Sequence, residues 1–252
     1  MPHPHGTGAV AVRVADGISV MRGLLPPAAA ARLRWFLGAE CKRQARRGSI
    51  EEVFGSVGSG DRRSFPVAAS QPVVQPVAAA LRDCGLLDGR VLGALTGLVS
   101  RPGGGTQPFH RDYPAMAATR HGLTQPLSVL VAVQGGTRVG FPPFLDPATE
   151  VVLGPGDALA WEGHVLHAGW GYDLPNLRLH LYLDTAQSVS CAAQTHLLAS
   201  ARLQREWMDA LHAQRLEARE GHEHHDEDAH GHRPAAARRR APGVAGTRVV
   251  AL

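Results

Sequence analysis

The most constraining feature of the sequence is a series of short apolar segments that begins at residue 91 and ends at residue 184. Turns rich in glycine and proline separate these segments, with no helical pattern between them. Such a series is typical of a β-sandwich or barrel and disfavours alternating β-α units. A short strand at residues 20–25 precedes the series, whose members are residues 91–100, 127–134, 150–153, 158–161, 164–169 and 177–184.

The last predicted strand has a strict alternation. Leucine occupies every second position of residues 177–184, and the positions between them hold polar or ionisable side chains. In an ordinary half-buried strand this polar side faces solvent, whereas in a barrel it can line a wet ligand cavity. The nearby His167 favours the cavity. The polar set is Arg178, His180, Tyr182 and Asp184.

Helices are expected on both sides of the β region. Two prolines at residues 26 and 27 open a predicted helix over residues 28–45, because proline is tolerated in a first turn. A second helix is predicted over residues 71–87, and a further helical pattern follows residue 185. The glycine- and serine-rich residues 51–64 lack the ending of a phosphate-binding loop, so we predict a mobile loop there.

The domain organisation follows from these elements. We expect one domain over residues 16–220, with its β core at about residues 91–184. Residues 1–15 are predicted to form a loose arm. Residues 221–252 mix histidines, acids and arginines and have almost nothing to bury, so we predict a disordered tail.

Composition limits the partners of the chain. The net charge of +4 and the pI of about 9.4 mildly favour anionic ligands, but the arginines are scattered, so nucleic-acid binding is not expected. No apolar run approaches the ~20 residues of a spanning helix, and the N-terminus lacks a secretory pattern. Three separated cysteines favour reduced thiols. We therefore expect an intracellular protein, cytoplasmic by default, with organelle targeting left open.

The triplet His110-Arg111-Asp112 carries the chemistry. On a strand, His110 and Asp112 point to the same face and can form two ligands of a metal site. His167 offers a third ligand. Two imidazoles and one carboxylate leave open positions that suit non-haem iron(II). Arg178 follows on the next strand, where its guanidinium can bind a carboxylate, for which 2-oxoglutarate is the natural candidate.

Three segments carry a resemblance to a known family: LVSRPGGGTQPFHRDYP, VVLGPGDALAWEGHVLHAGWGYDLPN and LRLHLYLD. From about residue 91 to 184 the chain resembles the Fe(II)/2-oxoglutarate-dependent dioxygenase superfamily. Its residue pattern is most similar to the phytanoyl-CoA hydroxylase-like and prolyl-hydroxylase-like branches. The resemblance implies a mainly β fold with flanking helices around a double-stranded β-helix, the cupin-like jelly roll. Its implied iron ligands are His110, Asp112 and His167, and its implied 2-oxoglutarate anchor is Arg178.

The resemblance also implies an activity. Iron(II), 2-oxoglutarate and O2 would serve to hydroxylate a C–H bond of a small molecule or a peptide side chain, with release of succinate and CO2. The arginine at residue 178 disfavours the prolyl-hydroxylase branch, because many prolyl hydroxylases have lysine at this position. The retained Asp112 disfavours the halogenase variant, in which a small residue leaves room for halide.

Several alternatives stay open at this point. His164 competes with His167 as third ligand, although only one of the two can face the metal from a strand, and the Leu-His-Ala-Gly context favours His167. A cupin-like metal protein without 2-oxoglutarate turnover, or a scaffold that stores metal on its histidine-rich tail, would also fit. The residues considered for lining or supporting the pocket are Gln107, Ser128, Trp161, His180 and Tyr182.

Overall fold

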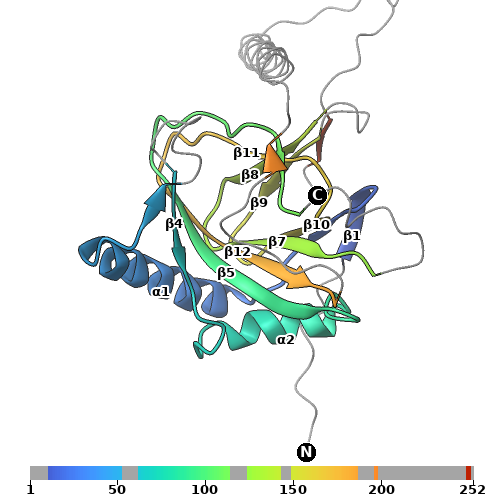
Figure 1. Cartoon of the computed structure of the whole chain (residues 1–252), viewed down its shortest axis with the longest axis horizontal. Helices are drawn as coiled ribbons and strands as arrows, with labels where there is room; N and C mark the ends of the chain where they lie inside the picture. Colours follow the sequence, from blue (N-terminus) through green and yellow to red (C-terminus); the bar gives the residue numbers. More distant parts are fainter. Residues whose placement is uncertain are drawn as a thin grey trace, which may run out of the picture.

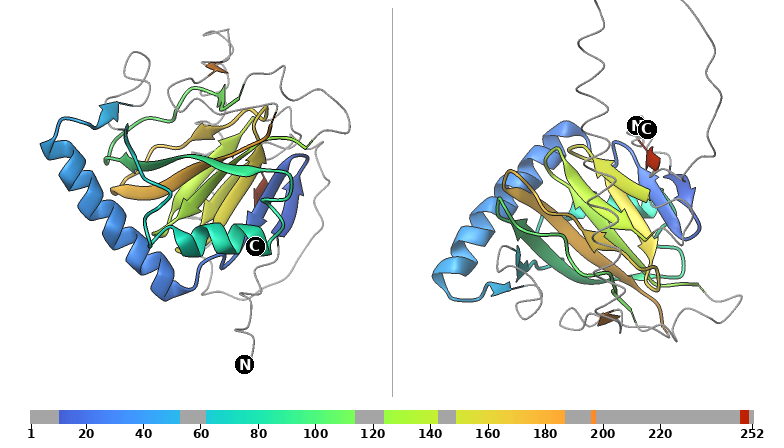
Figure 2. Two further views of the ribbon diagram at one scale, coloured as in Figure 1. Left: turned by 60° about the horizontal axis from the view of Figure 1, so that its bottom comes forward. Right: turned by 90° about the horizontal axis from the view of Figure 1, so that it is seen from above.

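The computed structural model describes residues 11–52, 62–113, 124–142, 149–186, 196–197 and 248–250. Two facing β-sheets form the body of the molecule, and two helices cover the outer face of the larger sheet (Figure 1). The helices are α1 (Pro27–Arg46) and α2 (Gln75–Asp83). Figure 2 shows both of them on the same side of that sheet.

The larger sheet has eight strands in the order β1-β2-β10-β7-β12-β5-β4-β3. The smaller sheet has the order β11-β8-β9-β14, and a short third pair joins β13 to β6. The pairings are antiparallel except that of β14 with β9. In chain order the strands are β1 (Ala11–Ala15), β2 (Ile18–Met21), β3 (Glu51–Glu52), β4 (Arg62–Pro66), β5 (Val91–Ser100), β6 (His110–Arg111), β7 (Leu127–Ala132), β8 (Thr137–Phe141), β9 (Thr149–Leu153), β10 (Ala158–Glu162), β11 (Ala168–Gly169), β12 (Asn176–Asp184), β13 (His196–Leu197) and β14 (Arg248–Val250).

An apolar core lies between the helices and the outer face of the large sheet. Leu33 and Leu37 of α1 and Leu81 of α2 are fully buried there, together with the leucines of β12. Helix α1 begins where the prolines predict, because the carbonyl of Pro26 accepts the N–H groups of Ala29 and Ala30. The leucine side of β12 therefore faces the helices.

A second core fills the space between the two sheets. Leu130 and Trp161 of the large sheet pack there with Val139, Phe141 and Val151 of the small one. Strand β7 contributes to both cores, since its alternate residues face the helices and the opposite sheet. This double burial explains the almost unbroken apolar sequence of residues 127–132.

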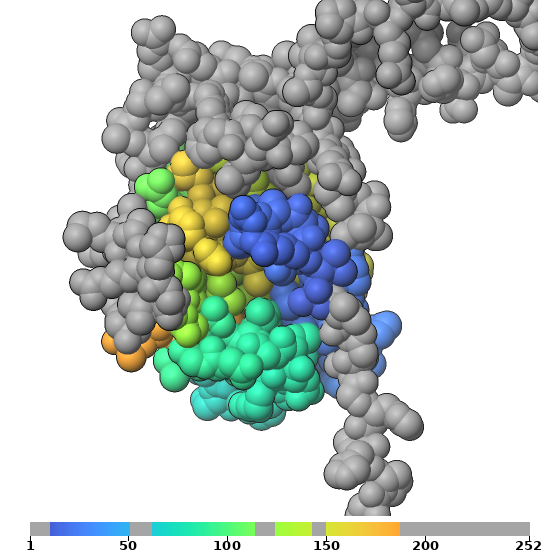
Figure 3. Space-filling model, turned by 90° about the vertical axis from the view of Figure 1, so that its right-hand side faces the viewer, coloured from blue at the N-terminus to red at the C-terminus, as the bar shows by residue number. Residues whose placement is uncertain are grey.

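The mainly β prediction is confirmed, and most predicted strands are present with bounds shifted by a few residues. Helix α2 is shorter than predicted. Of the predicted strand at residues 164–169 only β11 is regular, and His167 instead forms an isolated bridge with His110. Figure 3 shows the β1–β2 hairpin and the α2 region on one face of the molecule.

Some predictions were wrong. Strand β1 occupies residues 11–15 of the expected loose arm, and β3 and β4 lie in the expected loop over residues 51–64. Strand β4 forms because Phe65 packs directly over Gly97, where any β-carbon would lie 2.2 Å from the ring. Strand β8 likewise lies where no strand was predicted.

The predicted helices after residue 185 and the predicted tail lie outside the described residues, except where β13 and β14 form strands instead. Strand β13 pairs with β6, which carries His110, and β14 adds a parallel strand to the edge of β9. Within the described residues, no helix combines the length and apolarity needed to cross a lipid bilayer.

Candidate metal centre

The two histidines of the predicted triad are brought together by the backbone. The N–H of His110 donates to the carbonyl of His167, and the N–H of His167 donates to the carbonyl of His110, both at 3.0 Å. This reciprocal bridge places the imidazole rings 4.3 Å apart between centroids. Residues far apart in the sequence thus present two nitrogen ligands at one point.

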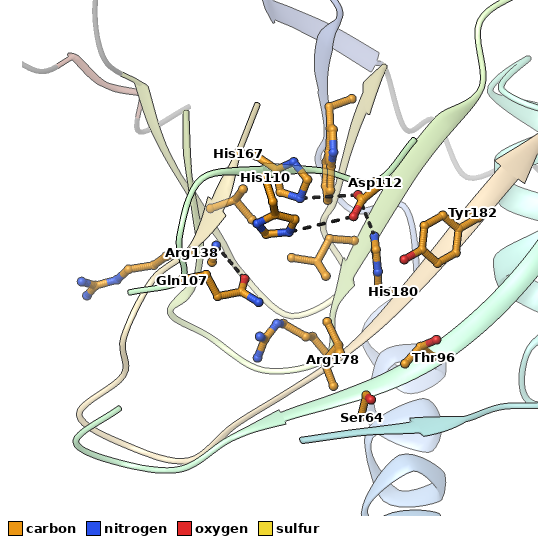
Figure 4. Close-up of a pocket in the computed structure, with 15 residues that line it drawn as sticks. Ser64, Thr96, Gln107, His110, Asp112, Arg138, His167, Arg178, His180 and Tyr182 are labelled. Carbon is orange, nitrogen blue, oxygen red and sulfur yellow. Dashed lines mark hydrogen bonds and ion pairs between the residues drawn. The ribbon is translucent and has the colours of Figure 1, made fainter. Parts of the chain in front are cut away.

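Asp112 completes a compact group with the two histidines. The ligand atoms of His110, Asp112 and His167 all lie within 4.8 Å of one another, and all three side chains are buried. The carboxylate oxygens of Asp112 lie 4.0 Å from His110 Nε2 and 3.4 Å from His167 Nε2. Figure 4 shows the three side chains pointing toward one another.

The outer nitrogens of both rings are fixed by backbone carbonyls. His110 Nδ1 lies 2.8 Å from the carbonyl of Pro108, and His167 Nδ1 lies 3.2 Å from that of Val165. Because a carbonyl only accepts, Nδ1 carries the proton in each ring. The lone pair of each Nε2 therefore faces Asp112, which is the tautomer that a metal ligand requires.

The protonation states also suit a metal. Burial lowers the pKa of His110 to about 3 and also lowers the pKa of His167, so both rings are neutral at neutral pH. Burial alone would raise the pKa of Asp112, but the imidazoles of His167 and His180 hold it below its ordinary range. Asp112 Oδ2 is buried, and no described residue makes a hydrogen bond to it. A cation is the group that would satisfy it.

His164 lies outside this group. Its side chain is 39% exposed, and its Nδ1 lies 3.6 Å from a carboxylate oxygen of Glu162. It lines a separate surface depression with Arg13 and Arg111. Within the described part of the chain, the geometry therefore assembles His167, and not His164, with His110 and Asp112.

The triad opens into a cavity of about 90 Å³ between the two sheets. One water needs roughly 10–15 Å³ by this measure, so the space suits a small organic acid. Arg178, His180 and Tyr182 line it (Figure 4), which confirms the prediction for three of the four polar residues. The fourth, Asp184, does not line the cavity and accepts a hydrogen bond from the Tyr113 hydroxyl. The remaining lining residues are Ser64, Thr96, Leu98, Gln107, Leu130, Arg138, Val139, Trp161 and Gly169.

Arg178 provides a buried positive charge in this cavity. It is 2% exposed, and its Nη1 donates to Ser100 Oγ at 3.0 Å and to Asn176 Oδ1 at 3.3 Å. Its guanidinium carbon also lies 5.3 Å from the centre of the Tyr172 ring. Among the described residues no carboxylate pairs with it. A buried guanidinium without a carboxylate is suited to bind an anionic ligand.

Of the supporting residues proposed from the sequence, Gln107, Trp161, His180 and Tyr182 line the cavity and Ser128 does not. Gln107 Oε1 accepts the N–H of Gly169 at 2.9 Å, and Trp161 stacks on His180 with an interplanar angle of 9°. His180 Nε2 lies 3.5 Å from Asp112 Oδ2. Ser128 is buried but does not line the cavity.

Sequence reasoning missed the lining residues on β4, β5 and β8. Ser64 lies in the segment that we predicted to be a loop, and Arg138 lies where no strand was predicted, so neither residue could be assigned to a strand face. The guanidinium of Arg138 is near Glu150, at 3.8 Å. Thr96 and Leu98 lie on a correctly predicted strand, where the two-residue period would have placed them on one face.

The chain was compared with known proteins. No family model matches it, and no curated protein matches its sequence. Many solved structures match its fold. A prolyl-4-hydroxylase from Pseudomonas putida has a TM-score of 0.50 and 17% identity, over 67% of this chain and 92% of that one.

Two further matches have the same TM-score. The epimerase SnoN, in complex with Fe3+, α-ketoglutarate and nogalamycin RO, is 13% identical over 74% of this chain and 92% of its own. HygX from Streptomyces hygroscopicus, with nickel and 2-oxoglutarate bound, is 12% identical over 68% of this chain and 83% of its own. This chain therefore shares the fold of these solved structures, the mainly β jelly roll that the sequence predicted.

Proposed function

We propose that this protein is an Fe(II)- and 2-oxoglutarate-dependent oxygenase that hydroxylates a C–H bond of a small molecule. The observation that carries the proposal is one small cavity that holds both a triad of two neutral imidazoles and a carboxylate and the buried guanidinium of Arg178, with which no carboxylate of the described residues pairs. The shared fold of the matched oxygenases supports it.

The triad fits the metal that the fold implies. His110, Asp112 and His167 would hold iron(II), with two neutral nitrogens and one charged oxygen. The unsatisfied Asp112 Oδ2 supports a cation at this place. With iron and 2-oxoglutarate bound, O2 is reduced, 2-oxoglutarate leaves as succinate and CO2, and the substrate C–H bond is oxidised.

The rest of the cavity would bind and shield the co-substrate. Arg178 would hold its distal carboxylate through the donors that are not directed at Ser100 and Asn176. Leu98 and Leu130 provide apolar wall, which excludes water and strengthens the charge pair. Trp161 and His180, stacked on each other, limit the space beside Asp112.

A small-molecule substrate is our choice over a peptide side chain. SnoN was solved with nogalamycin RO, which is a small molecule, although SnoN is an epimerase and not a hydroxylase. Hydroxylation is proposed because it is the simplest outcome of C–H oxidation. Product analysis by mass spectrometry separates the two outcomes, since hydroxylation adds one oxygen atom and epimerisation adds none.

The first test measures succinate release from 2-oxoglutarate by the iron-loaded protein. Asp112→Ala is expected to abolish release and keep the fold, whereas His164→Ala serves as a matched control and is expected to keep it. Arg178→Ala separates an oxygenase from a cupin-like metal protein, because only an oxygenase loses 2-oxoglutarate affinity in this variant. Undiminished release from Asp112→Ala would refute the proposal.

A further inference from the structure

We propose that Arg62 is a positioning residue that fixes the guanidinium of Arg178 for co-substrate binding, through the hydroxyl of Ser100. The inference rests on the proposed function, since it assigns Arg178 the carboxylate of 2-oxoglutarate. Arg62 lies on β4 and was expected from the sequence to be part of a mobile loop. It is instead 6% exposed.

The hydrogen bonds of Arg62 lead to two parts of the site. Its Nε donates to Ser100 Oγ at 3.2 Å, across the β4–β5 pair in which these residues are opposite each other. Its Nη2 donates to the carbonyl of Trp170 at 2.6 Å, and Nη1 donates to that of Gly169 at 3.2 Å. Arg62 thus joins β5 to the segment that follows His167.

Arg178 contacts the same serine from β12, which pairs with the opposite edge of β5 from β4. Its Nη1 donates to Ser100 Oγ, so one hydroxyl oxygen accepts from both guanidinium groups. Arg178 also donates to Asn176 Oδ1, and the amide of Asn176 donates to Thr137 Oγ1 at 3.1 Å. All five side chains of this network are buried. A buried, connected network of this kind holds its members in one arrangement.

This arrangement leaves a defined set of donors for an anion. Ser100 and Asn176 occupy Nη1 of Arg178, which orients the planar guanidinium within the cavity. Two cations that share one acceptor repel each other, and an incoming carboxylate relieves that repulsion. Arg62 therefore acts on affinity in two ways, because it orients the anchor and adds positive charge behind it.

The packing around Arg62 is close. A β-carbon at Gly169 would lie 2.8 Å from Arg62 Nη1 and 2.6 Å from Gln107 Oε1. Lysine cannot replace this arginine fully, because its single ammonium cannot reach a hydroxyl and two carbonyls in the planar fork geometry. The metal ligands should be less affected, since His167 is held by its own backbone bridge to His110.

The test compares 2-oxoglutarate and metal affinities in folded variants, with Ni2+ in place of iron to prevent turnover. Arg62→Ala is expected to raise the Kd for 2-oxoglutarate about tenfold or more and to change the Kd for Ni2+ by less than about threefold. Arg62→Lys should recover part of the loss. Arg90→Ala is the matched control, because Arg90 also donates to backbone carbonyls, those of Gln125 and Leu86, which lie outside the network of Ser100 and Arg178.

A double-mutant cycle tests the route through Ser100. Ser100→Ala should weaken 2-oxoglutarate binding, and Arg62→Ala in that background should weaken it by less than in the wild type, because the contact through Ser100 is already lost and only the charge of Arg62 is still removed. Full additivity would overturn the route. If Arg62→Ala does not fold, then Arg62→Lys, Ser100→Ala and Gly169→Ala carry the comparison.

The outcomes separate this inference from the proposed function. Folded Arg62→Ala with an unchanged Kd for 2-oxoglutarate would overturn the inference and leave the oxygenase assignment standing. A nickel-loaded wild type that binds no 2-oxoglutarate would overturn the assignment. In that case the positioning role of Arg62 is tested by NMR of the metal-free protein. The Nε–H signal of Arg178 is assigned by its loss in Arg178→Lys. Its hydrogen should exchange with water faster in Arg62→Ala than in the wild type. Unchanged exchange would overturn the inference.

Discussion

Acid should destabilise the metal-free protein in a pH window set by His110. Burial lowers the pKa of this ring in the folded state to about 3, whereas the unfolded value is about 6.5. As the pH falls below ~6.5, the unfolded chain binds a proton that the folded chain does not. The free energy of unfolding therefore decreases between about pH 6.5 and pH 3, and is fully retained above that window.

The magnitude follows from the shift. One group protonated only in the unfolded state changes the free energy of unfolding by about 1.4 kcal/mol per pH unit. His110 alone thus contributes a loss of about 2 kcal/mol between about pH 6.5 and pH 5. Burial lowers the pKa of His167 too, so the wild-type loss should be larger than this. Asp112 acts at lower pH, because the unfolded pKa of aspartate is about 3.9.

Urea unfolding with a metal chelator, at about pH 7, 6 and 5, measures this effect. The difference in free energy of unfolding between wild type and His110→Asn should shift by about 2 kcal/mol across the range, because asparagine does not titrate. His164→Asn is the control, since His164 lies outside the buried triad. Parallel pH profiles for wild type and His110→Asn would refute the assignment of a buried, neutral His110.

Three further predictions concern single contacts. Arg178→Ala should raise the Kd for 2-oxoglutarate by roughly 10- to 150-fold, the equivalent of about 1.5–3 kcal/mol for a hydrogen bond to a charged group, as measured by calorimetry on nickel-loaded protein. Tyr113→Phe should lower the free energy of unfolding by about 1.5–3 kcal/mol, because the Tyr113 hydroxyl donates to Asp184 at 2.8 Å in a buried site, and chemical denaturation checks this. Gly97→Ala should destabilise the fold by about 1–3 kcal/mol, since its β-carbon would overlap Phe65, and a lowered Tm with unchanged metal affinity is the expected result.

The sequence predicted an element correctly where the pattern lies within the element itself. The leucine alternation of residues 177–184 and the apolar run of residues 127–132 follow from burial on one or both faces, so β12 and β7 were predicted correctly. The triplet that contains His110 and Asp112 was also visible locally. The choice of His167 as the third ligand depended only on the predicted order of the strands and on its Leu-His-Ala-Gly context.

The rest depends on contacts between distant residues. Strand β4 is stabilised by Phe65 over Gly97 and by the bond from Arg62 to Ser100, and neither partner is evident from the composition of residues 51–64. Arg62 also donates to the carbonyls of Gly169 and Trp170. Because every residue has a backbone carbonyl, hydrogen bonds from Arg62 to carbonyls cannot be predicted from the sequence.

The alternation of β12 places two separate physical requirements on one segment. Its odd-numbered leucines belong to the core beneath the helices, and Arg178, His180 and Tyr182, at even-numbered positions, line the cavity. Substitutions of the leucines should change the free energy of unfolding, and substitutions of the cavity-lining residues should change which ligands the cavity binds. A slip of one residue would exchange the two sets, but β5 and β7 fix the register from both sides. The cavity-lining side chains of β12 can therefore change without loss of the hydrophobic core.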